Sequence, residues 1–301
     1  MLTAYTKIFA LGQSYISHIF DDEVEITEKI DGSQIVFGLV QGELHIRSKG
    51  GYIHDYLTRK ENDLFYPAIQ HIISIKGSLA DGYIYYGETL KKPKHNVLAY
   101  DSVPKGHIAL YGAQDDRGYF LEYSVLEKEA KELRIDIVPI LYKGKATPEM
   151  ILNMMDRVSI LGGQKIEGVV VKNYNKPTVI GGHVSPITVG KYVSEAFKEV
   201  HSSSWKEEHT GKGKWDLYKQ NFRTPARWNK AIQHLTEKGE LTSSPKDIGY
   251  LIKEVKEDIS QEEKENIKDF LWKEFGDEVL RESVKGLPEW YKEKLLKEGA
   301  T

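Results

Sequence analysis

The chain has 301 residues, 40% of them hydrophobic, and a formal net charge of -3. This length suits one large domain or two smaller ones, and this hydrophobic content can fill a core. The chain contains no cysteine, which excludes disulfides, cysteine-ligated zinc, iron-sulfur clusters and thiol nucleophiles.

Membrane and secretory segments are not expected from the sequence. No apolar run approaches the roughly 20 residues that a membrane helix needs. The N-terminus, MLTAYTKIFA, lacks the charged-then-apolar order of a signal peptide. We therefore expect a soluble, intracellular protein of the cytoplasm.

The first predicted strand covers residues 23–30, where apolar residues recur at every second position. Glu28 falls on the apolar face and Lys29 points the other way. Asp31, Gly32 and Ser33 have the composition of a turn, and residues 34–40 then read as a strand buried on both faces. Lys29 is thus predicted at the rim of a sheet, either as a solvated lysine of a surface hairpin or as a nucleophile.

The rest of the first 200 residues alternates strands and turns with a few helices. Further strands are predicted at 43–48, 82–88, 107–113, 119–125, 135–141 and 167–172. Helices are predicted at 124–135 and 147–161, the second with Thr147 as N-cap and Pro148 at its first position. This part of the chain is predicted to be an α+β domain.

After the polar stretch at 201–215 the hydrophobic period becomes helical. Thr224 and Pro225 open one helix that Gly239 closes, and Ser244 and Pro245 open the next. Ser260 with Glu263 has the spacing of a capping box for a third helix. We expect a first domain at 1–205, a linker at 206–222 and a small all-α domain at 223–301.

Charged residues gather at the predicted strand ends of the first domain, where sheets usually place sites. They are Arg47, Glu88, Glu167, Lys172 and Lys191. Each alone reads as an ion pair or a solvated strand end. Glu167 and Lys172 have opposite parity, so a bulge or a strand end must intervene if both line one pocket.

Five ordered elements, EKIDG, RSKGG, YYGE, EGVVVK and GKYV, resemble the motifs of the covalent nucleotidyltransferases, which include ATP-dependent ligases and capping enzymes. The resemblance covers about the first two thirds of the chain. It is strongest to the RNA ligases of the second type, the group of phage nick-sealing and kinetoplastid RNA-editing ligases. It implies a nucleotidyltransferase (adenylyltransferase) domain of antiparallel sheets with flanking helices, ahead of the helical domain.

The resemblance also implies the roles of individual residues. Lys29 would be the adenylylated lysine, with its neighbours Glu28 and Ile30 at the nucleotide. Glu88 would bind a ribose hydroxyl, and Tyr111 would stack on the adenine unless it is a core aromatic. The remaining ATP/AMP-binding residues would be Arg47, Glu167, Lys172 and Lys191, with Glu167 also holding metal-bound water.

A lysine amine attacks phosphorus only when it is neutral, although its ordinary pKa lies near 10.4. Burial and neighbouring cations favour the neutral form, and Arg47, Lys172, Lys191 and a divalent ion would supply those charges. The expected cofactors are ATP and Mg²⁺, with Mn²⁺ as an alternative. AMP would pass from ATP to Lys29, then to a 5′-phosphate, and a 3′-hydroxyl would displace it.

Two positions depart from the family pattern. Phage nick-sealing enzymes tend to carry histidine where this chain has Asp31, so the step which that histidine assists would run differently here. Motif V usually has two lysines around one residue, whereas this chain has Val189 and Lys191. One phosphate contact would then be missing or come from elsewhere.

The expected partner is RNA, as a nicked duplex, as RNA ends or as an RNA-DNA hybrid, with no membrane and no obligate protein partner. Candidate phosphate contacts are the basic run 91–95 and residues at the entrance of the helical domain, namely Lys212, Lys214, Arg223, Arg227 and Lys230. Arg223 and Arg227 are the nucleic-acid contacts we predict there. A DNA ligase-like enzyme and a non-catalytic nucleic-acid-binding relative are the alternatives. The helical pattern after Trp215 argues against the β-barrel with which DNA ligases and capping enzymes usually continue.

Overall fold

The computed structural model describes residues 2–96, 98–180, 183–193, 215, 218–219 and 222–298. The chain divides into two compact units, Met1–Ser202 and Ser203–Thr301. The basic run at 210–214 and most of the predicted linker lie outside the described residues. No helix in the described ranges combines the length and apolar character needed to cross a membrane.

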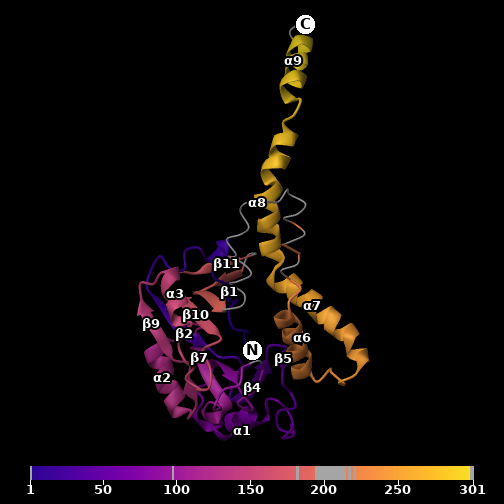
Figure 1. Ribbon diagram of the computed structural model, residues 1–301. Coiled ribbons are helices and arrows are strands. Elements are labelled where there is room, and N and C mark those ends of the chain that lie inside the picture. Colours follow the sequence, from indigo (N-terminus) through magenta and orange to yellow (C-terminus); the bar gives the residue numbers. More distant parts are fainter. Residues whose placement is uncertain are drawn as a thin grey trace. The chain divides into compact units, whose positions relative to one another are not determined.

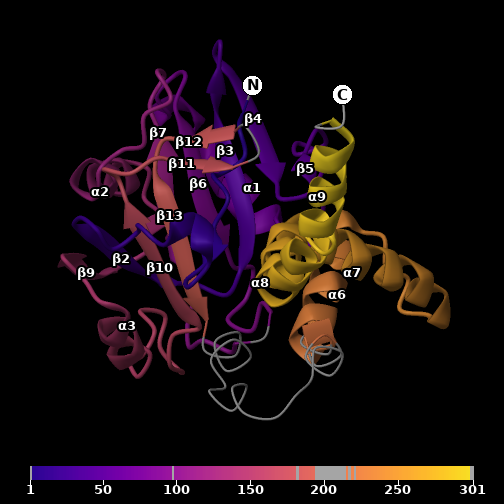
Figure 2. The same ribbon diagram turned by 90° about the horizontal axis from the view of Figure 1, so that it is seen from above.

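The first unit contains two larger sheets and a hairpin (Figures 1 and 2). The five-stranded sheet has the order β1 (Phe9–Ala10), β13 (Thr188–Val193), β10 (Gly168–Asn173), β2 (Val24–Lys29), β9 (Ile140–Gly144). The six-stranded sheet has the order β5 (Gly51–Tyr52), β4 (Glu43–Ser48), β3 (Ser33–Val40), β6 (Ile84–Thr89), β7 (Ile108–Gln114), β8 (Asp136–Ile137). The hairpin pairs β11 (Thr178–Ile180) with β12 (His183–Ser185). With its helices α1 (Tyr66–Ser74), α2 (Tyr123–Glu132) and α3 (Pro148–Met154), the unit is α+β, as predicted.

Strand register decides which side chains share a face of the five-stranded sheet. Residues directly opposite each other point the same way, and successive residues alternate. Lys29 lies opposite Gly168, and Lys191 lies opposite Val170, two residues further along β10. Lys172 follows after two more residues. Lys29, Lys172 and Lys191 therefore lie on one face of this sheet.

The same reasoning places Arg47 and Glu88 together on the six-stranded sheet. Val36 of β3 lies opposite both Arg47 of β4 and Tyr86 of β6, and Gln34 lies opposite Glu88. Positions 34 and 36 share a face, and so do positions 86 and 88. Arg47 and Glu88 therefore share the face that carries Val36 and Tyr86.

The two faces that carry these charged residues are turned toward each other. Val36 and Tyr86 from the six-stranded sheet belong to one hydrophobic cluster with Val189 from the five-stranded sheet, and Val170 packs against it. Separate clusters fill the outer faces, one beneath α1 and α2 and one beneath α3. The inner cluster thus joins the two sheets and holds their functional faces close together.

Three predicted elements of the first unit differ from the structure. Residues 119–125 do not form a strand, because Leu126 and Ala130 instead bury one stripe of α2, which begins at Tyr123. The predicted strand at 135–141 is divided between β8 and β9. The helix predicted at 147–161 ends at Met154, because the chain then turns back and pairs Val158 with Lys165.

One helix of the first unit was missed entirely. Tyr66–Ser74 forms α1, with Pro67 in its first turn and Ala68, Ile69 and Ile72 buried. This spacing of apolar residues is helical and was a usable signal. The helix covers the six-stranded sheet through the same cluster as α2.

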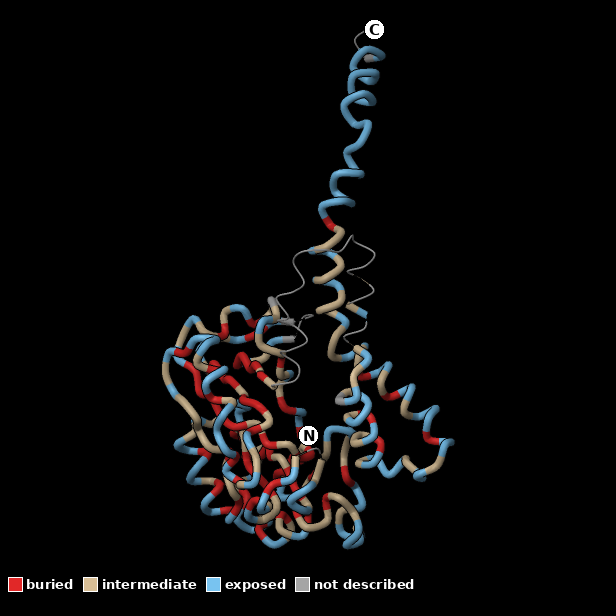
Figure 3. Tube along the Cα trace, viewed as in Figure 1, coloured by how far each residue is buried: buried red, intermediate tan, exposed pale blue. Residues whose placement is uncertain are grey.

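The described part of the second unit is helical. It consists of α6 (Pro225–Lys238), α7 (Ile248–Glu262), α8 (Lys264–Ser283) and α9 (Leu287–Glu298). Thr224 caps α6 by accepting from the Arg227 backbone, and Gly239 ends it with a left-handed φ of 71°, as predicted. Beyond Gly276, residues 277–297 of α8 and α9 are exposed (Figure 3).

The capping box of the second unit lies elsewhere than predicted. Ser244 and Asp247 form it, ahead of α7. Ser260 instead lies inside α7, and Glu263, which was expected to cap backbone, binds Arg227. The predicted capping box at Ser260 is therefore wrong, because α7 continues through Ser260 and ends at Glu262.

Candidate active site

Lys29 is the last residue of β2 and stands directly before a tightly packed turn. Ile30 is 3% exposed and packs against Leu90, Tyr100 and Leu161, which fixes the chain just after Lys29. A Cβ on Gly32 would lie 2.7 Å from the Thr89 carbonyl oxygen and 2.8 Å from Glu88 Cγ. Only glycine therefore lets the turn lie this close to the end of β6.

The Lys29 Nζ lies 2.5 Å from Glu167 Oε2, and the two side chains are 28% and 22% exposed. Glu167 directly precedes β10. The alternation of side chains between the two faces of a strand therefore does not apply to Glu167, and its carboxylate reaches the face that carries Lys29. Glu167 thus lies just outside the strand that contains Lys172. A strand end, rather than a bulge, therefore allows these two residues of opposite parity to reach the same face.

The charge state of Lys29 follows from its neighbours. Burial lowers the pKa of the ammonium, but the carboxylates of Glu167, Glu88 and Asp31 outweigh burial and hold the pKa above its ordinary value. Burial likewise raises the pKa of Glu167, while Lys29 and Lys191 lower it. The protein by itself therefore favours the protonated form of Lys29, so burial and the cationic side chains do not neutralise it without the divalent ion that was also expected.

Lys172 lies deeper than Lys29. It is 3% exposed, and its Nζ donates to the backbone oxygen of Tyr111 at 2.5 Å. Burial lowers its pKa to about 8, although Glu25 acts in the opposite direction. An anion that reaches Lys172 would stabilise its charged form, because the protein itself compensates this charge poorly.

Tyr111 lies where the register between β6 and β7 shifts by one residue. Its hydroxyl accepts a hydrogen bond from Gln34 Nε2 at 2.8 Å, and its ring meets Tyr5 edge-on at 5.0 Å between centroids. It is half-buried between two hydrophobic clusters. The extra residue of the bulge turns this ring toward the space between the sheets.

Arg47 is held on the opposite sheet. Its Nη1 donates to the Leu2 backbone oxygen at 3.2 Å, and its guanidinium lies 5.7 Å from the centre of the Tyr52 ring. Glu88 shares its face and acts electrostatically on Lys29. The structure thus brings together six charged positions, namely Lys29, Arg47, Glu88, Glu167, Lys172 and Lys191.

Glu28 and Ile30, which were predicted at the nucleotide, point their side chains elsewhere. Glu28 is on the opposite face of β2 from Lys29 and is 2% exposed. Its carboxylate accepts from the Ser159 hydroxyl at 2.5 Å and from the Ile160 backbone at 3.0 Å. The side chain of Glu28 therefore fixes the 159–161 loop, and that of Ile30 fills the core.

Sequence reasoning missed the residues that fix the turn after Lys29. The Asp31 backbone donates to Tyr100 Oη at 2.8 Å, and the Asp31 carboxylate accepts from the Leu98 backbone at 2.8 Å and from Asn96 Nδ2 at 3.3 Å. These partners are more than 60 residues away along the chain. No local pattern marks them, so only the fold could reveal them.

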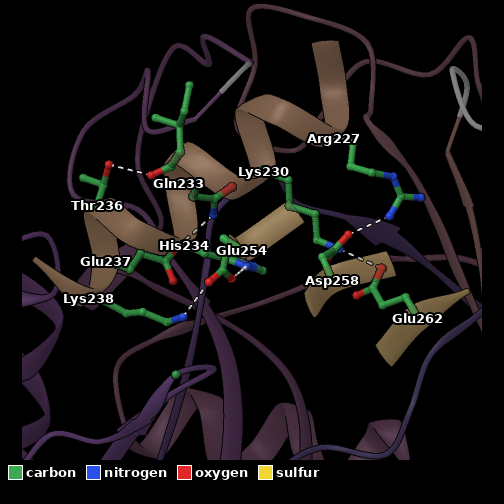
Figure 4. A network of polar contacts seen from close by, with 12 residues as sticks. Arg227, Lys230, Gln233, His234, Thr236, Glu237, Lys238, Glu254, Asp258 and Glu262 are labelled. Carbon is green, nitrogen blue, oxygen red and sulfur yellow. Dashed lines mark hydrogen bonds and ion pairs between the residues drawn. The ribbon is translucent and has the colours of Figure 1, made fainter. Parts of the chain in front are cut away.

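The two arginines predicted to bind nucleic acid have different surroundings. Arg227 Nη1 lies 2.6 Å from Asp258 and its Nη2 lies 2.8 Å from Glu263. Lys230, His234 and Lys238 continue this line of polar contacts along α6 to the acidic residues of α7 (Figure 4). Arg227 therefore holds the two helices together, whereas Arg223 is exposed.

The described residues form no metal site of their own. Among the described residues there is no group of three or more histidine and carboxylate side chains that could hold a metal ion by themselves. Mg²⁺ does not require one, because it usually keeps several waters and binds through one or two carboxylates plus substrate phosphates. Glu167 alone therefore fits such a cation if a phosphate substrate completes the shell.

A sequence model of RNA ligases matches residues 22–193, more than half of the chain. The chain belongs to the RNA ligase family. The matched range contains every residue of the site between the sheets, from Lys29 to Lys191. Family membership confirms the resemblance that the five ordered motifs indicated.

Solved structures show the same fold. Naegleria gruberi RNA ligase is similar as a lysine-to-alanine mutant with ATP and Mn, as an arginine-to-alanine mutant with ATP and Mn, and as an aspartate-to-alanine mutant without ligand. In each case the identity is 21%, the TM-score is 0.50, and the match covers 66% of this chain and 58% of the Naegleria chain. This chain therefore spans less than two thirds of that protein's length. No curated protein sequence matches it significantly.

Proposed function

We propose that this member of the RNA ligase family is an ATP-dependent RNA ligase that works through a lysyl-AMP intermediate. The observation that carries the proposal is the setting of Lys29. It ends β2 at 2.5 Å from the Glu167 carboxylate, on the same sheet face as Lys172 and Lys191. A lone solvated lysine of a hairpin would not have such neighbours.

The first step would be attack of Lys29 Nζ on the α-phosphorus of ATP, with a nitrogen-phosphorus bond forming as the bond to pyrophosphate breaks. Lys29 must first lose to solvent the proton that the carboxylates of Glu167, Glu88 and Asp31 stabilise. Glu167 would hold a divalent cation through water, as Mg²⁺ prefers. When bound, this cation supplies positive charge that offsets the carboxylates and the phosphate oxygens.

Arg47, Lys172 and Lys191 would stabilise the charge of the transferring phosphate from both sheets. Fixed cations in a partly buried site act more strongly than the same charges in water, and they need no rearrangement during the reaction. Glu88 would accept hydrogen bonds from a ribose hydroxyl. Tyr111 would stack on the adenine, because it places a half-buried ring between the sheets.

Two further displacements would complete ligation. An oxygen of an RNA 5′-phosphate would attack the phosphorus of the lysyl-AMP, forming a phosphoanhydride and releasing the Lys29 amine. A 3′-hydroxyl would then attack the 5′-phosphate, forming a phosphodiester and releasing AMP. Covalent catalysis divides one difficult condensation into easier displacements.

The second unit would contribute to RNA binding and the first to nucleotide chemistry. All groups invoked for attack on ATP precede residue 202, where the first unit ends. Arg223, which is exposed at the start of the helices, would contact phosphates. Arg223→Glu should then weaken RNA sealing and leave lysyl-AMP formation intact; equal sealing by this variant would remove Arg223 from the interface.

The test of the proposed function is a sealing assay on nicked duplexes that differ only in the sugars flanking the nick. With ATP and Mg²⁺, we expect nicks that are flanked by RNA to be sealed faster than all-DNA nicks. Faster sealing of all-DNA nicks would favour the DNA ligase alternative. Binding of all duplexes with neither lysyl-AMP nor sealing would favour the non-catalytic alternative.

A further inference from the structure

The loop that begins at Lys91 is folded directly onto the turn that follows Lys29. Asn96 Nδ2 donates to the Gly32 backbone oxygen at 2.6 Å, and the Leu98 backbone donates to Asp31 Oδ2 at 2.8 Å. His95 Nε2 lies 2.9 Å from Ser33 Oγ. The loop is thus anchored to all three residues of the turn.

His95 also fixes the outer part of this loop. Its Nδ1 accepts from the Lys91 backbone at 2.9 Å, so its Nε2 carries the proton toward Ser33. Burial lowers the pKa of His95 to about 4, which Asp31 only partly opposes. The imidazole therefore stays neutral at physiological pH and serves as a rigid link between the loop and the turn.

The outer part of the loop presents positive charge only. Residues 91–100 include three lysines and no acidic residue. Lys91 Nζ donates to the Glu61 backbone oxygen, whereas Lys92 and Lys94 are exposed. Within the part of the chain that the structure describes, neither of these two forms an ion pair.

We propose that the loop Lys91–Asn96 binds the sugar-phosphate backbone of RNA through Lys92 and Lys94. The bound phosphates would lie close to the RNA end that reacts at Lys29. This inference rests on the proposed ligase function. A phosphate-binding surface here would position the substrate, because contacts to phosphates fix register without reading sequence. The adjacent 5′-phosphate must reach the adenylate on Lys29, so cations near this lysine are where such contacts are needed.

Distance and rigidity both support this position. Two Cα steps of about 3.8 Å keep Asp31 within roughly 7.6 Å of Lys29, and the loop is hydrogen-bonded to Asp31 itself. A loop that is already ordered loses less conformational freedom on binding than a mobile one. Lys92 and Lys94 thus differ from lysines on an ordinary solvated surface by belonging to a loop that is hydrogen-bonded to the turn after Lys29.

The experiment compares the full-length wild type with Lys92→Gln/Lys94→Gln. The matched control, Lys128→Gln/Lys131→Gln, removes two exposed lysines of α2 that lie among glutamates. Binding is measured by fluorescence anisotropy over a range of salt, with a nicked RNA duplex whose 3′ end lacks the reactive hydroxyl. Lysyl-AMP formation is measured separately with ATP and Mg²⁺ in the absence of RNA.

We expect the loop variant to bind the nicked RNA roughly tenfold or more weakly, and its slope of log K against log salt to fall by about 2, as for two lost phosphate contacts. Lysyl-AMP formation should stay within twofold of the wild type, and the control should match the wild type throughout. Unchanged affinity and slope, or equal losses in the control, would overturn the inference. Loss of lysyl-AMP formation would overturn it too, by placing the loop in nucleotide chemistry.

Failure of the inference and failure of the proposed function remain distinguishable. A wild type that seals nicked RNA, together with a loop variant that binds and seals equally well, removes only the role of the loop. A wild type that forms no lysyl-AMP removes the ligase function, and the binding and salt data still decide whether the loop contacts RNA.

Discussion

Lys172 should give the stability of the first unit an unusual dependence on pH. Its pKa is lowered from 10.5 to about 8 by burial. Each pKa unit corresponds to about 1.4 kcal/mol, so keeping this lysine charged destabilises the fold by about 3 kcal/mol. Between pH 8 and 10.5 the unfolded chain binds this proton and the folded chain does not, so stability from this group rises with pH across that window.

The perturbation is Lys172→Met, which removes the charge and keeps most of the side-chain volume. All five tryptophans lie at position 205 or later, so tryptophan fluorescence does not report on the first unit. Urea unfolding should therefore be followed by pulse proteolysis, with the surviving fragment identified by mass. Relative to the variant, the wild type should gain about 3 kcal/mol between pH 8 and 10.5.

The control is Lys165→Met, which removes a lysine that is 65% exposed in the same unit. The change with pH of its stability difference from the wild type is the reference for losing a lysine at the surface. A Lys172→Met difference that changes with pH no more than this reference would contradict the prediction, because the buried amine would then be no harder to charge than a surface one. In adenylylated protein the gain should shrink, because a nearby phosphate favours the charged lysine.

Three further outcomes are expected. Gly32→Ala should destabilise the first unit by about 1–3 kcal/mol and slow lysyl-AMP formation. Gly77→Ala should do neither, because an added Cβ there meets nothing within 4 Å. Equal effects at both positions would contradict the close packing of the turn. Arg227→Met should destabilise the helical unit by about 3 kcal/mol, as measured by urea unfolding followed by tryptophan fluorescence. Lysyl-AMP formation should stay normal. A loss confined to RNA affinity would instead support Arg227 as a nucleic-acid contact. Tyr111→Phe should leave the ATP dependence of lysyl-AMP formation nearly unchanged. Tyr111→Ala should weaken the apparent affinity for ATP by about 1 kcal/mol, or roughly fivefold. Equal losses in both variants would point to the hydroxyl that Gln34 contacts.

The strands that carry the site were predictable because their signals are local. The apolar alternation around Lys29 and the run 167–172 predicted β2 and β10 closely, and the turn at Asp31 to Ser33 followed from its composition. Lys172, Arg47 and Glu88 could be named from their positions at strand ends and from the order of the motifs. Their arrangement on facing sheets could not, because it depends on strand register across distant segments.

The contacts of two other predicted site residues depend on the fold in the same way. The family resemblance placed Glu28 at the nucleotide; neighbours in a strand point to opposite faces, and its carboxylate accepts from Ser159. Arg227 was assigned to RNA because basic residues cluster near it in sequence. Its ion-pair partners within the chain, Asp258 and Glu263, lie more than 30 residues away and become visible only when α6 and α7 pair.

The state of Lys29 was the least predictable property of the site. The chemistry required a neutral amine, and burial, the cationic side chains and a divalent ion were together expected to favour it. The carboxylates around Lys29 prevail in the protein by itself, and they raise its pKa. A sequence shows which charges exist, whereas their balance at one atom depends on distances that only the fold sets.

The measurement that tests the central claim most directly is mass spectrometry of the intact protein and its peptides after incubation with ATP and Mg²⁺. We expect a mass increase of one adenylate, located on Lys29, that disappears in Lys29→Ala while the variant stays folded. Adenylate on another residue, undiminished labelling of Lys29→Ala, or better labelling of the wild type by GTP would contradict it.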